Sequence, residues 1–339
     1  MIQRRIEWVD SLKFLGIFAI YLGHLGHQAG NAYEFVFRYH VALFFFCAGF
    51  FTKNIIHTPV IKFVSAKTLK ILVPYYIFSF IFILLLSVNE SWNADKLIKG
   101  FYSILSGIRN DQYVGSLWFL NCIYVTFLLD YLFVRILRNK FFVLAASAFA
   151  LIYTQVFMTH NPRIEPSWFW NIDSALSFWF FMAAGRVMFK KLDESALMNI
   201  SSKKSIIPFI LSAVVAALYF YVGPDWIFKL LKIKFSDTGF FKFFFYISYS
   251  TAGSLILIIF NIFIAKKMAT SKFISNIGSN TLSICGLENS VKLIFPIVFS
   301  TIGVSIKLTT PMSAFLYAFS CLILANFLSK ILKKYAPIK

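Results

Sequence analysis

The stretch ILVPYYIFSFIFILLLSV, residues 71–88, contains no charged residue and is long enough to cross a bilayer as one helix. Lys67 and Lys70 precede this stretch, and Asn89 and Glu90 follow it, so polar residues mark both of its ends. Strands and buried helices of soluble proteins rarely need so long an uninterrupted apolar run. The stretch therefore predicts a transmembrane helix, and similar runs recur along the chain.

The composition agrees with a protein that lies mostly in the membrane. Of the 339 residues, 59% are hydrophobic and only 14% are charged, against about 25% charged in ordinary soluble domains. The net charge of +19 comes from short basic clusters between apolar runs, a distribution that argues against nucleic-acid binding. The four cysteines lie inside apolar runs without CxxC spacing, so neither a disulfide framework nor a zinc ribbon is indicated.

We predict an all-α integral membrane protein, a bundle of about ten transmembrane helices. The first run is no cleavable signal peptide, because it contains Lys13 and His24 and no small-residue cleavage site follows it. One transmembrane domain is expected to occupy the whole chain, 1–339, with no appended soluble domain. The helices are expected at 12–28, 35–52, 70–88, 116–134, 141–158, 168–189, 206–222, 243–264, 280–299 and 310–329.

Basic residues predict that both termini are cytoplasmic. An even number of helices places the termini on one side, and that side receives about twice as many Lys and Arg residues as the other. The richer side includes Arg4, Arg5, Lys53, Lys140 and Lys339, and the poorer side includes residues 96–109 and 229–242. On the poorer side, the polar segment 89–115 suits a hydrophilic substrate, and 226–235 suits a short interfacial helix. Both segments are equally well explained as solvated connectors.

The first span holds Asp10, Lys13, His24 and His27. Lys13 and His24 are eleven residues apart, which on a helix is about 20° around the axis and about 16 Å along it. His27 is expected one turn beyond His24 on the same face. A charge inside a span costs about 2.5 to 3.5 kcal/mol, so a Lys13 and His24 pair on one face of the span favours a functional role for these two residues. The alternative is structural: Lys13 reaches the interface, Asp10 caps the helix, and the histidines bond between helices.

Arg38 stands two residues before His40 at the start of the second span. The guanidinium suits an anionic group or a second imidazole, although an interfacial anchor explains it equally well. His24, His27 and His40 together suggest a zinc site, but Glu34 is the nearest carboxylate for such a site. We therefore expect no metal.

Later spans carry three further polar features. Trp118 opens the fourth span between Ser116 and Asn121, and Asp173 lies early in the sixth. Glu288 and Lys292 are four residues apart in the ninth span, so they face the same way and can neutralise each other. A structural role is the simpler interpretation of this pair.

An ordered set of motifs over essentially the whole chain resembles membrane acyltransferase family 3, whose members acylate bacterial surface sugars. The opening segment matches the family pattern of a basic residue and, after ten intervening positions, a His. Glu288 departs from the pattern, because many members have His there. The matching segments are Glu7–Lys13 with Gly23–His24, Tyr39–Phe50, Lys67–Tyr75, Ser116–Leu120, Phe180–Arg186 and Thr281–Ser283.

The resemblance implies acyl transfer from acyl-CoA, usually acetyl-CoA, to a sugar hydroxyl of a surface polysaccharide or its lipid-linked precursor. It implies that His24 is catalytic, and imidazoles are suited to this role because they titrate near neutral pH. Direct proton abstraction and a covalent acyl-His remain equally open. The residues expected to bind CoA or substrate are Lys13, Asp10, Arg38, His40, Trp118 and Glu288.

Acyl-CoA enters this interpretation as a co-substrate, with no bound cofactor. The expected partners are a glycan or lipid-linked glycan acceptor, the lipid bilayer of a bacterial inner membrane, and proteins of polysaccharide biosynthesis. No nucleic-acid partner is expected. The main competing interpretation is a polytopic transporter or flippase, in which the buried His, Lys and Glu residues relay protons or bind cargo.

Overall fold

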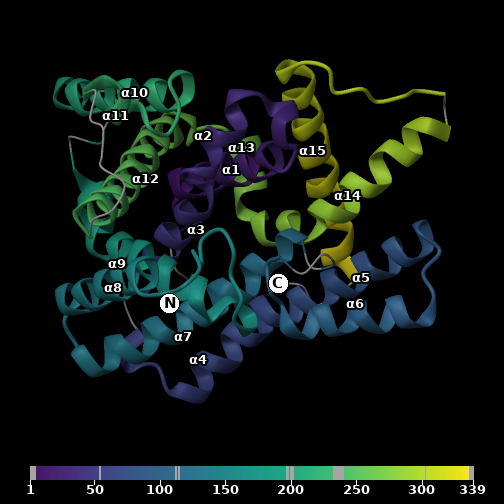
Figure 1. Ribbon diagram of the computed structural model, residues 1–339, viewed down its shortest axis with the longest axis horizontal. Helices are drawn as coiled ribbons and strands as arrows, with labels where there is room; N and C mark the ends of the chain where they lie inside the picture. The colour runs from purple at the N-terminus through teal and green to yellow at the C-terminus, as the bar shows by residue number, and fades with distance from the viewer. Residues whose placement is uncertain are drawn as a thin grey trace. The chain divides into compact units, whose positions relative to one another are not determined.

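The computed structural model describes residues 5–52, 55–110, 113, 115–195, 198, 202–231, 240–301 and 303–335. Every regular element within these residues is helical, as Figure 1 shows along the coloured chain. The all-α prediction is thus confirmed for the described chain. Some residues used in the sequence predictions lie outside it, namely Arg4, Lys53, Asp111, Lys232, Lys234, Phe235 and Lys339.

Seven helical segments in the described part of the chain are long and apolar enough to cross a membrane. A further apolar helix, α8 (Lys140–Val156), and α1 (Glu7–Gly23) have 17 residues each. Each of the ten predicted runs overlaps with helix. The protein is therefore a multi-pass helical membrane protein, and the number of ten membrane crossings stays a prediction. The seven segments are Val60–Asn89, Gly115–Leu137, Phe169–Glu194, Lys203–Tyr221, Ile247–Met268, Thr281–Thr301 and Pro311–Lys334.

The second predicted span is wrong as one continuous helix. Residues 35–52 contribute to two short helices, α2 (Asn31–Phe37) and α3 (His40–Gly49). Between them, the amides of Arg38 and Tyr39 donate to carbonyls three residues back, those of Phe35 and Val36. This tighter hydrogen bonding separates α2 from α3.

The chain divides into two compact units. The first consists of Met1–Cys47, Met188–Thr281 and Leu308–Phe319. In it, α1 packs against α12 (Phe240–Met268) and α13 (Lys272–Ser279), while α10 (Ile206–Tyr221) packs against α12 and α2 (Figure 1). A Cβ on Gly278 would lie 1.8 Å from the carbonyl oxygen of Asp10, so only glycine lets α13 approach α1 this closely.

A short helix, α11 (Trp226–Leu231), occupies part of the segment for which an interfacial helix was predicted. Its hydrophobic and basic residues alternate as expected, and the rest of that segment lies outside the described residues. The helix is therefore confirmed, and its place at the membrane surface stays a prediction.

The second unit consists of Ala48–Val187, Leu282–Lys307 and Ser320–Lys339. Its helices include α4 (Val60–Lys67), the π-helical turn η3 (Thr68–Leu72), α5 (Val73–Asn89), α7 (Trp118–Leu137), α9 (Ile172–Glu194), α14 (Thr281–Thr301) and the later part of α15 (Pro311–Tyr335). Within it, α7 packs against η3, α4 and α8. The polar segment 89–115 contains a helix as well, α6 (Ala94–Ser106), which packs against α5.

A buried ion pair joins α7 to α9 in the second unit. The carboxylate of Asp130 is fully buried, pairs with the guanidinium of Arg186, and accepts a hydrogen bond from Nε1 of Trp179 at 3.0 Å. Nε of Arg186 also donates to Oγ1 of Thr52 at 2.7 Å. The carboxylate of Asp130 is thus fully partnered inside an apolar unit, which is the condition for its burial, while Nη1 of Arg186 is buried without a hydrogen-bond partner.

Candidate active site

The first turn of α1 holds a cluster of charges. Oδ2 of Asp10 accepts from Nε of Arg5 at 2.7 Å, and its Oδ1 accepts from Nζ of Lys13 at 3.1 Å. Nη2 of Arg5 also donates to the carbonyl oxygen and Oγ of Ser275 on α13, at 2.9 and 2.8 Å. The N-cap residue is Ile6, without a side-chain cap bond, so Asp10 does not cap the helix. Its buried carboxylate instead orients Lys13 and links α1 to α13.

His24 lies at the opposite end of α1, where it is the C-cap residue and exposed. Lys13 and His24 thus remain eleven residues apart on one helix. His27 belongs instead to the 3₁₀ turn η1 (Gly26–Ala29), because Gly26 adopts a φ of 61° and turns the chain. The prediction that His27 continues the line of Lys13 and His24 is wrong for this reason.

His40 is buried at the start of α3. Its Nδ1 lies 2.7 Å from the carbonyl oxygen of Val36, and because a carbonyl only accepts, Nδ1 carries the proton. The ring of Phe37 lies near both imidazoles, with centroids 4.9 Å from that of His40 and 6.4 Å from that of His24. The structure therefore brings His24 and His40 to one aromatic ring.

Arg38 lies in the turn between α2 and α3. Its side chain lines a small pocket with Tyr219, Pro224, Tyr249 and Ser250, and its Nε is buried without a hydrogen-bond partner. This pocket has a cavity volume of about 10 Å³, enough for about one water molecule. Arg38 thus presents a buried donor among aromatic side chains.

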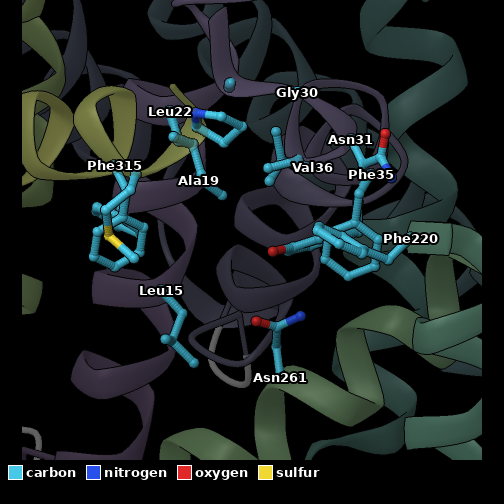
Figure 2. Close-up of a pocket in the computed structure, with 16 residues that line it drawn as sticks. Leu15, Ala19, Leu22, Gly30, Asn31, Phe35, Val36, Phe220, Asn261 and Phe315 are labelled. Carbon is cyan, nitrogen blue, oxygen red and sulfur yellow. The ribbon is translucent and has the colours of Figure 1, made fainter. Parts of the chain in front are cut away.

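A larger pocket of about 690 Å³ lies in the first unit, beside the last two turns of α1. Figure 2 shows Leu15, Ala19 and Leu22 along one side of it and Phe35 and Phe220 along another. Its remaining lining residues are Phe18, Ala29, Gly30, Asn31, Ala32, Val36, Tyr39, Asn261, Pro311, Met312 and Phe315. The pocket residues on α1 form one face of the helix, and His24 is not among the lining residues.

Trp118 and Glu288 belong to the second unit. Trp118 begins α7 and is buried, with the guanidinium carbon of Arg109 4.9 Å from its ring centre. Glu288 is fully buried on α14 and accepts from Nζ of Lys292 at 2.6 Å, which confirms the predicted pair. Asp10, Lys13, His24, Arg38 and His40 all belong to the first unit.

Arg163 is a residue that the sequence interpretation did not single out. Its guanidinium carbon lies 5.8 and 5.4 Å from the ring centres of Phe178 and Phe181, and its Nε and Nη2 are buried without hydrogen-bond partners. Burial lowers the pKa of Arg163 to about 10. Nη1 of Arg109 donates to the carbonyl oxygen of Arg163. The sequence carried no clear signal for this arrangement, because the two arginines lie in separate loops.

Asp173, at the start of α9, organises the loop that carries Arg163. Its Oδ2 lies 2.9 Å from Nε2 of His160 and accepts from the amide of Ser167 at 2.8 Å. Oγ of Ser167 also approaches Nε2 of His160, at 3.2 Å. One imidazole nitrogen thus meets both partners, whereas a nucleophilic triad needs a different nitrogen for each. The arrangement is a loop anchor.

Among the described residues, no group of three or more His, Cys, Asp or Glu side chains gathers in a way that could hold a metal ion. His24, His27 and His40 lie on three different elements, η1 separating the first from α2 and α3. The geometry therefore supplies no support for the alternative zinc site.

The comparison with family models matches the acyltransferase domain to residues 6–330. No curated protein and no solved structure matches the chain. The matched region begins just before α1 and ends within α15, so it includes every element described above except the end of α15. With this match over nearly its whole length, the chain belongs to the membrane acyltransferase family 3, as its ordered motifs predicted.

Proposed function

We propose that the protein transfers an acyl group from acyl-CoA, with acetyl-CoA as the expected donor, to a sugar hydroxyl of a bacterial surface polysaccharide or its lipid-linked precursor. The observation that carries this proposal is the match to the acyltransferase family over residues 6–330. The placement of Lys13 in the second turn of α1 and of His24 at its C-terminal end supports it, because donor binding and acyl transfer then have separate places on one helix.

Lys13 is proposed to bind the phosphates of CoA. Its ammonium is oriented by the carboxylate of Asp10 at 3.1 Å and remains 25% exposed, so an anionic ligand can approach it. Asp10 in turn is held by Arg5 at 2.7 Å. The pantetheine arm of CoA would extend toward His24, over an axial distance of about 16 Å.

His24 is proposed to take the proton from the acceptor hydroxyl as its oxygen attacks the thioester carbonyl. A carbon–oxygen bond forms, the carbon–sulfur bond breaks, and the proton passes from the imidazole to the sulfur of CoA. In an alternative order, an imidazole nitrogen of His24 attacks the thioester carbonyl, the carbon–sulfur bond breaks and CoA leaves as its thiolate. The sugar hydroxyl then attacks the acyl-imidazole, the carbon–nitrogen bond breaks, and the hydroxyl proton balances the thiolate charge to give the CoA thiol. The second order lets the acyl group cross the membrane without CoA.

Four other residues are proposed to contact substrate. Arg38 offers a buried Nε next to Tyr219 and Tyr249, beside a cavity of about 10 Å³ that has room for about one hydroxyl group. His40 and Trp118 offer an imidazole and an indole ring for a sugar. Glu288 is proposed to contact substrate through its carboxylate, whose charge Lys292 on the same helix neutralises.

We propose that the protein lies in the inner membrane of a bacterium, with about ten membrane spans and both termini cytoplasmic. The basic clusters between the apolar runs support this orientation. Its partners would be acyl-CoA, the glycan or lipid-linked glycan, the bilayer and proteins of polysaccharide biosynthesis.

The test uses membrane vesicles that contain the protein, radiolabelled acetyl-CoA and the acceptor glycan of the parent strain. We expect labelled glycan and free CoA. His24→Ala should lower the rate by about 10² to 10⁴, the usual contribution of a general base, while His27→Ala, in the turn beyond the helix, is the matched control and should retain activity. His40→Ala should be intermediate.

A well-expressed His24→Ala protein that acylates at the parental rate would contradict the mechanism. Glycan mass spectrometry of a deletion strain and its parent identifies acyl mass and acceptor together. If the two glycans are identical and the vesicles release no CoA, the transporter interpretation is favoured instead.

A further inference from the structure

Arg163 lies in the loop between α8 and α9, and one edge of its guanidinium has no partner. Nε and Nη2 are both buried without a hydrogen-bond partner. These two nitrogens direct N–H bonds to the same side of the guanidinium, which is the side that binds two oxygens of one phosphate or carboxylate. Within the part of the chain that the structure describes, no carboxylate pairs with Arg163. A single water molecule would accept a hydrogen bond there but would leave the charge unneutralised.

A second guanidinium lies close to Arg163. Nη1 of Arg109 donates to the carbonyl oxygen of Arg163, and the guanidinium carbon of Arg109 is 4.9 Å from the ring centre of Trp118. The rings of Trp118 and Phe178 are 6.4 Å apart, and the guanidinium carbon of Arg163 is 5.8 Å from that of Phe178. Two cations thus share one cluster of aromatic rings, and like charges in apolar surroundings are stabilised by an anion between or beside them.

The carboxylate of Asp173 is directed to other groups. Its Oδ2 lies 2.9 Å from Nε2 of His160 and accepts from the amide of Ser167 at 2.8 Å, and its Oδ1 accepts from the amide of Ser174 at 2.8 Å. Asp173 therefore holds the loop in place and is not the counter-ion of Arg163.

The loop lies at the end of two apolar helices. α8 ends at Val156, and the candidate span Phe169–Glu194 begins directly after the loop. Exposed aromatic side chains, including Phe157 and Trp168, stand at its two ends, as is typical of the headgroup level of a bilayer. On the predicted orientation this loop is external, on the side opposite to the proposed CoA site. The oxyanion present at that level is the phosphate of a membrane lipid.

We propose that the Nε and Nη2 edge of Arg163 binds the phosphate of a membrane lipid. The side chain as a whole is half-buried rather than enclosed, so a lipid can reach it from the surface of the second unit. Two sources share this chemistry. One is the phosphate of a lipid-linked glycan, which is an acceptor in the proposed function, and the other is the headgroup of a phospholipid.

The test measures the binding of radiolabelled polyprenyl phosphate to the full-length protein in detergent, with the matching polyprenol, which lacks the phosphate, as the comparison. We expect the phosphate lipid to bind about tenfold more tightly than the alcohol. Unlabelled phosphatidylglycerol then identifies the source: displacement at equal concentration assigns the site to phospholipid headgroups, and retention of the label assigns it to the isoprenoid carrier. Equal binding of phosphate and alcohol would overturn the proposal.

Arg163→Gln removes both the charge and the bidentate edge, so it should abolish the preference for the phosphate. Arg163→Lys keeps the charge without that edge and should retain part of the preference. Arg138→Gln, at an exposed position of the same unit, removes the same charge and is the matched control, which should keep the parental preference. Equal losses in Arg163→Gln and Arg138→Gln would show a general attraction between a basic protein and anionic lipids, and the site at Arg163 would be wrong.

Thermal unfolding gives a second readout. Because Arg163 carries a buried charge without a counter-ion, Arg163→Gln without lipid should unfold at the parental temperature or above it, and a lower midpoint would contradict the proposal. Polyprenyl phosphate should raise the midpoint of the parent, since a ligand of the folded state stabilises it, and should leave that of Arg163→Gln unchanged. An equal rise in both would also contradict it. Neither measurement involves acyl transfer, so their failure would leave the proposed function untouched.

Discussion

Replacing Lys13 by Ala tests whether this residue binds the donor or only anchors the helix. The carboxylate of Asp10 would lose one partner at 3.1 Å but would keep Arg5 at 2.7 Å. No buried charge is therefore left unpaired, and the large cost of breaking a buried pair is avoided. We expect the protein to stay folded, so that the change is seen in donor binding.

The expected magnitude follows from the exposure of Lys13. Hydrogen bonds to charged groups contribute about 1.5 to 3 kcal/mol, and each 1.4 kcal/mol is about a factor of ten in affinity. Because its side chain is 25% exposed, solvent screens part of the attraction and the lower end of this range applies. Lys13→Ala should thus raise the KM for acyl-CoA about tenfold, with a smaller effect on kcat.

The assay measures initial rates over a range of acyl-CoA concentrations in sealed vesicles, with thermal unfolding of the purified protein as the folding check. Lys13→Arg should keep most of the activity because the charge remains. Lys272→Ala, at the exposed start of α13, removes the same charge from the same unit and is the matched control. A KM for Lys13→Ala within twofold of the control would refute donor binding and favour the anchor.

Three further predictions concern stability and topology. Asp130→Asn removes the carboxylate that pairs with a buried guanidinium on α9 and should cost about 3 to 5 kcal/mol; an unchanged unfolding midpoint in detergent would contradict this role. Gly278→Ala forces α13 away from α1. It should lower the free energy of unfolding by about 1 to 3 kcal/mol and raise the KM for acyl-CoA. A parental KM together with parental stability would show that this close approach is unimportant. Reporter fusions after Lys140 should read cytoplasmic and those near Asn93 external, and reversed signals at both sites would discard the predicted orientation.

The sequence by itself determined that the protein is an all-helical, multi-pass membrane protein and where most of its apolar helices lie. Long apolar runs bounded by charges have one stable state in a bilayer, because a helix satisfies its own backbone groups there. Spacing alone also predicted the ion pair of Glu288 and Lys292, because residues four apart on a helix lie on the same face. The family also followed from local motifs, which the match over residues 6–330 confirmed.

Only the tertiary structure decided how the polar residues are partnered. Hydropathy could not locate the break at Arg38 and Tyr39, because apolar residues continue on both sides of it. Nor could it show that Asp130 pairs with Arg186, 56 residues later. Such contacts depend on how separate helices pack, and helix packing is set by side-chain shape over the whole interface rather than by any local period. The pocket beside α1 has the same origin, since its walls come from α1, α2, α10, α12 and α15.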